Sequence, residues 1–95
     1  MDNSMIGGWS VNPDLAPCSL PQDVATLFTE VVGSLLGAKY EPLMLCGSQI
    51  VSGVNYMFIC KQTMVIPDAP IHLVKLTIYK PIQGKGVITD ITRIL

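Results

Sequence analysis

Apolar residues recur at helical spacing in the segment 20–36. The members of this stripe fall at positions i, i+3, i+4, i+7, i+8, i+11 and i+12: Val24, Leu27, Phe28, Val31, Val32, Leu35 and Leu36. On a helix this spacing gives one continuous apolar face. Ser19 and Gln22 have the spacing of a capping box, and Pro21 suits the first turn, where its missing amide hydrogen costs little. With Gly37 as a stop signal, the sequence predicts an amphipathic helix over residues 20–36.

After this helix the pattern changes to residues that favour strands. Segments rich in Val, Ile, Thr, Tyr and Met are separated by clusters of Gly or Pro and cover residues 42–49, 53–63, 71–80 and 86–94. Short links between successive strands favour an antiparallel meander with the helix packed on one face. The predicted fold class is therefore α+β, with one N-terminal helix on a four- to five-stranded antiparallel sheet.

Residues 1–19 follow neither pattern. Gly7-Gly8, Pro13 and Pro17 disfavour regular structure, so this segment is predicted to be an extended arm. Ninety-five residues can bury one modest core, so we expect residues 1–95 to form a single domain.

Alternation along the strands assigns the faces of the sheet. With a turn centred at Val51, Cys46 would lie opposite Tyr56 and Met44 opposite Phe58. The expected core face contains these residues and the matching positions of the next strand: Met44, Cys46, Tyr56, Phe58, Cys60, Val74, Leu76 and Ile78.

The same register leaves an apolar patch on the open face of the sheet. Its members would point to solvent: Leu43, Leu45, Met57 and Ile59. Antiparallel sheets usually make an open face polar, so the patch indicates self-association or another covering surface. The alternative is a different register, or a local bulge that turns one pair inward.

Charge and hydropathy exclude several classes of function. The net charge of −1 argues against a nucleic-acid partner, which needs a basic patch. No apolar run reaches the ~20 residues that cross a bilayer, so no membrane role is expected. No basic segment followed by an apolar stretch marks a signal peptide, which favours a cytoplasmic protein, although a mature secreted protein would look the same.

The cysteines give little chemistry. The chain has three cysteines, Cys18, Cys46 and Cys60. Their odd number and the lack of CxxC spacing argue against a disulfide framework and a zinc site. Free cysteines are mostly buried, so we expect small core residues suited to a reducing cytosol. The alternation of residues along the strands places Cys46 and Cys60 on the core face of the sheet. Neither is therefore expected to act as a nucleophile with His72, the single histidine, as its base. The chain is therefore not expected to be an enzyme, and no cofactor or metal is predicted.

The most informative segment is 49–53, with the sequence Gln-Ile-Val-Ser-Gly, followed by Val54-Asn55-Tyr56. Its small residues lie between two strand-like runs, as in a hairpin tip. The segment resembles the QxVxG hairpin of cystatins, and is most similar to that of the stefin branch. Cystatins inhibit papain-like cysteine proteases by plugging the active-site cleft.

Other segments follow in the order of the family. Met5-Ile6-Gly7-Gly8 resembles the start of stefins, where a methionine-led arm carries a glycine pair. Tyr40, the His72-Leu73 pair and the Lys80-Pro81-Ile82 loop also stand where stefins carry similar residues. The resemblance covers about residues 5–94.

The resemblance implies a reversible, tight-binding inhibitor of papain-like proteases of the cathepsin type. Such an inhibitor would act as a monomer that can form a domain-swapped dimer by opening the hairpin. The N-terminal arm and two hairpin loops would occlude the cleft. The residues implied to contact the protease are Ile6, Gly7, Gly8, Gln49, Ile50, Val51, Ser52, Gly53, Pro81 and Ile82. Gly53 would allow a positive φ or a close backbone approach, and Gly53→Glu would block binding with the fold intact.

One departure leaves an alternative open. Ile82 follows Pro81 in a short loop, where secreted cystatins carry Trp after Pro and stefins carry a Leu-Pro pair. The alternative is a cystatin-like fold without inhibitory activity that serves as a binding or self-assembly module. In that case Gly7-Gly8 is a flexible tail, and residues 49–53 and 81–86 are ordinary connections.

Overall fold

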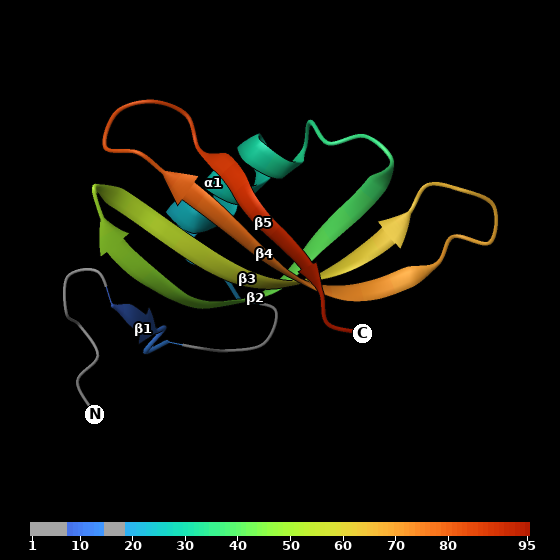
Figure 1. Ribbon diagram of the computed structural model, residues 1–95, viewed down its shortest axis with the longest axis horizontal. Helices are drawn as coiled ribbons and strands as arrows, with labels where there is room; N and C mark the ends of the chain where they lie inside the picture. Colours follow the sequence, from blue (N-terminus) through green and yellow to red (C-terminus); the bar gives the residue numbers. More distant parts are fainter. Residues whose placement is uncertain (1–7, 15–18) are drawn as a thin grey trace.

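The structure is a computed structural model that describes residues 8–14 and 19–95. A helix packs on one face of a five-stranded antiparallel sheet with the strand order β1-β2-β3-β4-β5 (Figure 1). In chain order the elements are β1 (Trp9–Val11), α1 (Gln22–Val32), β2 (Ala38–Val51), β3 (Gly53–Met64), β4 (Ile71–Lys80) and β5 (Val87–Arg93). This arrangement confirms the predicted α+β class and the antiparallel meander.

Helix α1 is shorter than the predicted segment 20–36. Its last residues are two valines, and Gly33 and Ser34 follow; none of these is a strong helix former. The helix therefore ends at Val32, and Gly33 donates its amide hydrogen back to the last turn. Leu36, predicted on the apolar face, is 96% exposed, so that part of the prediction is wrong. No helix in the described segments is long and apolar enough to cross a membrane.

The predicted capping box is absent from the start of α1. Pro21 occupies the position before the first helical residue, and no side chain caps the helix there. The Pro21 carbonyl accepts the amide hydrogen of Ala25 at 2.9 Å. Ser19 instead forms a β-bridge with Met44 of β2, so the sheet and not the helix holds it.

Strand β1 lies in the segment predicted to be an irregular arm. It pairs antiparallel with the end of β2, with Trp9 opposite Gln49. Directly after β1, Asn12 donates its amide hydrogen to the Cys46 carbonyl at 2.9 Å and its side-chain amide to the Leu45 carbonyl at 3.0 Å. These bonds hold residues 9–12 against the sheet and make β1 its fifth strand.

The register of β2 against β3 differs from the prediction for two reasons: the turn is centred at Ser52 and not at Val51, since Val51 lies opposite Gly53, and β2 contains two β-bulges. The pairing of β2 with β3 shifts at Leu43 and again at Cys46, and each of these residues lies between two paired positions. The predicted pairs Cys46–Tyr56 and Met44–Phe58 are therefore wrong. Strand β2 is longer at both ends than predicted, whereas the bounds of β3, β4 and β5 agree with the prediction to within one residue.

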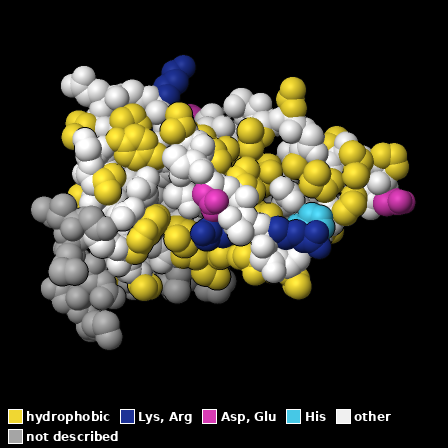
Figure 2. All heavy atoms as spheres, viewed as in Figure 1, with side chains coloured by type: hydrophobic (Ala, Val, Ile, Leu, Met, Phe, Trp, Pro, Cys, Tyr) yellow, Lys and Arg dark blue, Asp and Glu magenta, His cyan; other side chains and the backbone are white. Residues whose placement is uncertain are grey.

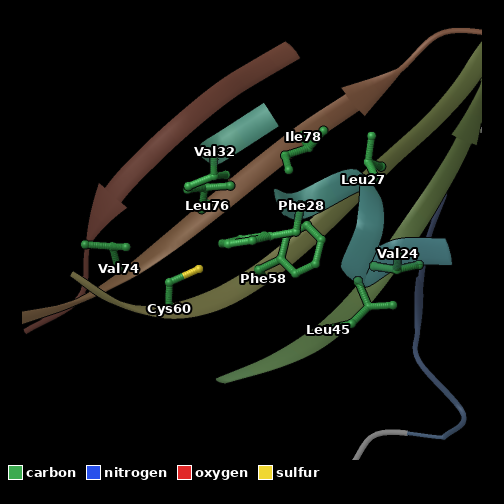
Figure 3. Packing of buried hydrophobic residues seen from close by; sticks show 10 residues of the cluster. All are labelled: Val24, Leu27, Phe28, Val32, Leu45, Phe58, Cys60, Val74, Leu76 and Ile78. Carbon is green, nitrogen blue, oxygen red and sulfur yellow. The ribbon is translucent and has the colours of Figure 1, made fainter. Parts of the chain in front are cut away.

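The core lies between α1 and the sheet (Figure 3). Its buried members come from both layers: Val24, Leu27, Phe28, Val32, Leu45, Phe58, Cys60, Val74, Leu76 and Ile78. The rings of Phe28 and Phe58 meet edge-on, with 5.0 Å between their centroids. The bulges turn Leu45 inward, so its predicted exposure is wrong, and Met44 and Cys46 are only partly buried. Three other members of the predicted open patch are half-buried: Leu43, Met57 and Ile59.

Candidate functional site

Three segments meet at one end of the sheet, which we call the hairpin end (Figure 1). They are the β2–β3 turn at residues 49–53, the β4–β5 loop at residues 81–86, and Gly8, which directly precedes β1. Because Trp9 lies opposite Gln49, the antiparallel course of β1 brings Gly8 toward the turn. Segments far apart in the sequence thus form one composite surface.

The tip of the first hairpin exposes apolar side chains. Ile50 is 54% and Val51 38% exposed, and the exposed Ser52 lies between the paired residues Val51 and Gly53. Covering such side chains is favourable by about 25 cal/mol per Å² of apolar surface. The tip therefore carries apolar surface that a partner could cover.

A polar pair braces the base of this hairpin. The Asn55 side-chain amide donates to Oε1 of Gln49 at 2.9 Å, and the two residues lie opposite each other in the β2–β3 pairing. Gln49 thus acts within the hairpin, where its side chain ties one strand to the other.

Gly53 is required by the geometry of the hairpin end. Its φ is +108°, a value that residues with a Cβ rarely adopt. A Cβ added there would lie 2.5 Å from the Lys80 carbonyl oxygen and 3.0 Å from the Cα of Pro81. Both properties expected of this glycine are present: the positive φ and the close backbone approach.

The second loop is held by a lysine at its base. The Lys80 ammonium donates to the Pro81 carbonyl at 3.1 Å and to the Gly84 carbonyl at 2.7 Å. Gly84 has a φ of +117°, which lets the loop turn back toward β5. Ile82 is 77% exposed, so the loop adds a further apolar side chain to the hairpin end.

The arm contributes less of the described surface. Gly8 is half-buried, whereas Ile6 and Gly7 lie outside the described residues. Trp9 is partly exposed on the open face of the sheet and lines a depression of about 170 Å³. The other residues around this depression are Ser10, Val11, Cys46, Gly47 and Met57. Figure 2 shows this open face, where hydrophobic side chains are spread with few charged ones between them.

Gly47 is the residue that lets β1 dock. A Cβ there would clash with the Ser10 carbonyl oxygen and would lie 3.5 Å from the Cα of Val11. Gly47→Ala is therefore expected to detach β1 and to lower the free energy of unfolding by roughly 1 kcal/mol. Trp9 is the single tryptophan, so its fluorescence reports the change as a red shift and stronger acrylamide quenching.

The matched control for this prediction is Gly37→Ala. Gly37 has a φ of +89° and nothing within 4 Å of the added Cβ, so the substitution costs stability without touching β1. An unchanged Trp9 emission spectrum in Gly47→Ala would contradict the proposed docking of β1.

The described thiols are poorly suited to nucleophilic chemistry. Cys46 and Cys60 are both free. Burial raises the pKa of Cys60 to about 12 and also raises the pKa of Cys46. Both thiols are protonated at neutral pH, whereas a nucleophilic cysteine needs its thiolate form. Within residues 8–14 and 19–95, no group of His, Cys, Asp and Glu side chains could hold a metal ion.

No pattern in the sequence singles out Tyr79, the neighbour of Lys80. The Tyr79 hydroxyl donates a hydrogen bond to the Ser52 carbonyl at the tip of the first hairpin. Alternation along a strand assigns such a residue to a face, but it does not say which loop atom the side chain reaches. This contact could not be foreseen from the sequence.

The comparisons with known proteins give no relative. No family model matches the chain, and no curated protein or solved structure shows significant similarity to it. Any function must therefore be argued from the residues and their geometry.

Proposed function

We propose that this chain is a reversible, tight-binding inhibitor of papain-like cysteine proteases, with a cystatin-like fold. The supporting sequence feature is the QIVSG hairpin with its upstream glycine pair and downstream Pro81-Ile82. The observation that carries the proposal is the convergence of Gly8, the turn 49–53 and the loop 81–86 at one end of the sheet.

The proposed action is occlusion of the protease cleft by shape and apolar burial. The tip of the first hairpin is narrow because Ser52 alone separates the paired residues Val51 and Gly53. Exposed Ile50, Val51 and Ile82 supply the apolar surface that would leave water on binding. No residue of this chain needs to react, so binding is expected to be reversible.

A pair of valine substitutions tests the proposal. Val51→Asp places a charge at the hairpin tip, where it would have to be desolvated in the cleft. We expect the inhibition constant for papain to rise at least about 30-fold, the change that follows from losing 2 kcal/mol at an interface hot spot. Steady-state assays of papain with the purified variants measure it.

Val65→Asp is the matched control. Val65 is 68% exposed in the link between β3 and β4, at the end of the sheet opposite the hairpin end. The substitution changes the net charge by the same amount but should alter the inhibition constant by less than roughly two-fold, because only screened long-range forces change. Equal losses in the two variants would argue against the hairpin tip as the contact.

Blocking the catalytic thiol of papain gives a second test. Papain carboxymethylated on that cysteine should still bind the chain in titration calorimetry, because no covalent bond is proposed. Full activity of papain and cathepsins in the presence of micromolar protein would overturn the inhibitor proposal.

A non-inhibitory self-assembly module is the second candidate function. The observation that favours it is a set of exposed hydrophobic residues outside the hairpin end: Leu36, Val65, Ile66, Ile71, Ile94 and Leu95. Exposed apolar surface of this kind often marks an association site. Under this alternative, sedimentation velocity would show concentration-dependent dimers that Ile66→Asp abolishes, and papain would stay active.

A domain-swapped dimer that opens the 49–53 hairpin would likewise lack inhibitory activity.

A further inference from the structure

The end of β4 carries two adjacent side chains that reach different loops. Tyr79 lies opposite Asn55, and Lys80 lies opposite Val54 in the β3–β4 pairing. Adjacent residues of a strand point to opposite faces of the sheet. Tyr79 and Lys80 therefore hold the hairpin end from both sides.

Tyr79 ties β4 to the tip of the first hairpin. Its hydroxyl donates to the carbonyl of Ser52, the single residue between the paired ends of β2 and β3. The Tyr79 ring also lies against Gly53, since a Cβ there would be 3.1 Å from Cε1 of the ring. Tyr79, which lies outside the first hairpin, thus hydrogen-bonds to the backbone of the tip at Ser52 and packs against it at Gly53.

Lys80 orders the second loop. Its ammonium donates to the Pro81 and Gly84 carbonyls, and hydrogen bonds of charged groups are stronger than neutral ones. The Lys80 carbonyl oxygen, in turn, occupies the space that a side chain on Gly53 would need. The same residue therefore contacts the first hairpin with its backbone and the second loop with its side chain.

We propose that Tyr79 and Lys80 are positioning residues that lock the two loops of the hairpin end into one preorganised unit. The step from this rigidity to tight binding rests on the proposed inhibitory function. A surface that is already ordered loses less conformational entropy when it binds. Removing the Tyr79 or the Lys80 contact should therefore weaken binding to the protease, although neither contact is made with the protease itself.

Tyr79→Phe tests the first contact, because it removes only the hydroxyl. In the free protein we expect amide hydrogen exchange at residues 51–53 to accelerate about five-fold, the change that follows from losing one hydrogen bond. The inhibition constant for papain should rise by a similar factor. Nuclear magnetic resonance on the free protein supplies a readout that needs no protease.

Tyr40→Phe is the matched control. The Tyr40 hydroxyl accepts a hydrogen bond of 2.8 Å from the Gln62 side chain, far from the hairpin end. This variant undergoes the same chemical change, but exchange at residues 51–53 and inhibition should stay at wild-type values. Equal effects of the two variants at the hairpin tip, or no effect of Tyr79→Phe, would overturn the proposal.

Lys80→Met tests the second contact. It keeps an apolar stem and removes the ammonium, so amide exchange in residues 82–86 should accelerate about five-fold or more. Lys75→Met removes the same charge from the same strand, where Lys75 pairs with Asp90 at 3.5 Å, and should leave this loop unchanged. Equal exchange in the two lysine variants would remove Lys80 from the proposal.

The two readouts separate this inference from the inhibitory function. If Tyr79→Phe loosens the tip but wild-type protein leaves papain active, the preorganised unit stands and the inhibitor proposal fails. If wild-type protein inhibits papain and Tyr79→Phe changes neither exchange nor inhibition, the inhibitor proposal stands and the positioning role of Tyr79 fails.

Discussion

Gly53→Ala is expected to lower the free energy of unfolding by about 2–5 kcal/mol. A residue with a Cβ at a φ of +108° costs roughly 1–2 kcal/mol through its backbone alone. The added Cβ would lie 2.5 Å from the Lys80 carbonyl oxygen, and forcing such an overlap apart typically costs a further 1–3 kcal/mol. Urea denaturation of wild type and variant measures the difference.

Gly84→Ala separates the two causes. Gly84 has a similar φ of +117°, but the nearest atom to its added Cβ is a side-chain carbon of Pro81 at 3.5 Å, an ordinary contact distance. This variant should lose only the backbone contribution of roughly 1–2 kcal/mol. If the two alanine variants were equally stable, the contact between the first hairpin and the end of β4 would be looser than described.

The same geometry changes how a charged substitution at this position must be interpreted. The sequence suggested that Gly53→Glu would block binding with the fold intact, but a glutamate brings the same Cβ overlap with Lys80. Loss of inhibition in that variant would reflect a distorted hairpin end as much as a lost contact. Val51→Asp avoids this problem because Val51 already carries a Cβ.

Regular patterns in the sequence predicted most of the fold. The stripe that starts at Val24 identified α1, and the Gly- and Pro-bounded segments identified four strands to within a few residues. These predictions succeeded because a buried face imposes a period of 3.6 or 2 on the residues that form it.

The errors in assigning residues to a face of the sheet occur where one inserted residue interrupts the alternation along a strand. Leu43 and Cys46 are inserted as bulges, and every assignment of a face between them is displaced by one position, so that Leu45 is buried. A bulge depends on the partner strand and leaves no pattern in its own sequence. Strand β1 was missed for a related reason, because a three-residue strand is too short to show alternation.

The convergence of the two loops at the hairpin end was predictable from the sequence, but the contacts that hold them were not. In an antiparallel meander, alternate turns lie at the same end of the sheet, so the predicted strand order already places the QIVSG motif and Pro81-Ile82 at one end. The sequence does not give contacts such as that of Tyr79 with Ser52. Such contacts join residues 27 positions apart and follow no local rule. The contacts that join the end of β4 to the tip of the first hairpin are therefore what the structure adds to the resemblance.

Phe58→Ala is expected to cause the second large loss of stability, about 3–5 kcal/mol. Phe58 is fully buried at the centre of the sheet, and its ring packs edge-on against Phe28 of α1. The substitution leaves a cavity in the layer that joins helix and sheet. For a domain of this size 1 kcal/mol corresponds to about 4–8 °C in melting temperature, so the midpoint should fall by more than roughly 10 °C.

A double-mutant cycle with Phe28→Ala isolates the ring contact. The two rings should be coupled by about 0.5–1.5 kcal/mol beyond the area that each buries, as edge-on aromatic pairs generally are. Ile71→Ala is the control for generic truncation: Ile71 is 59% exposed in β4, and its loss should cost less than about 0.5 kcal/mol. Additive effects of the two Phe variants would mean that α1 is held by its whole apolar face, with no special contribution from the Phe28–Phe58 contact.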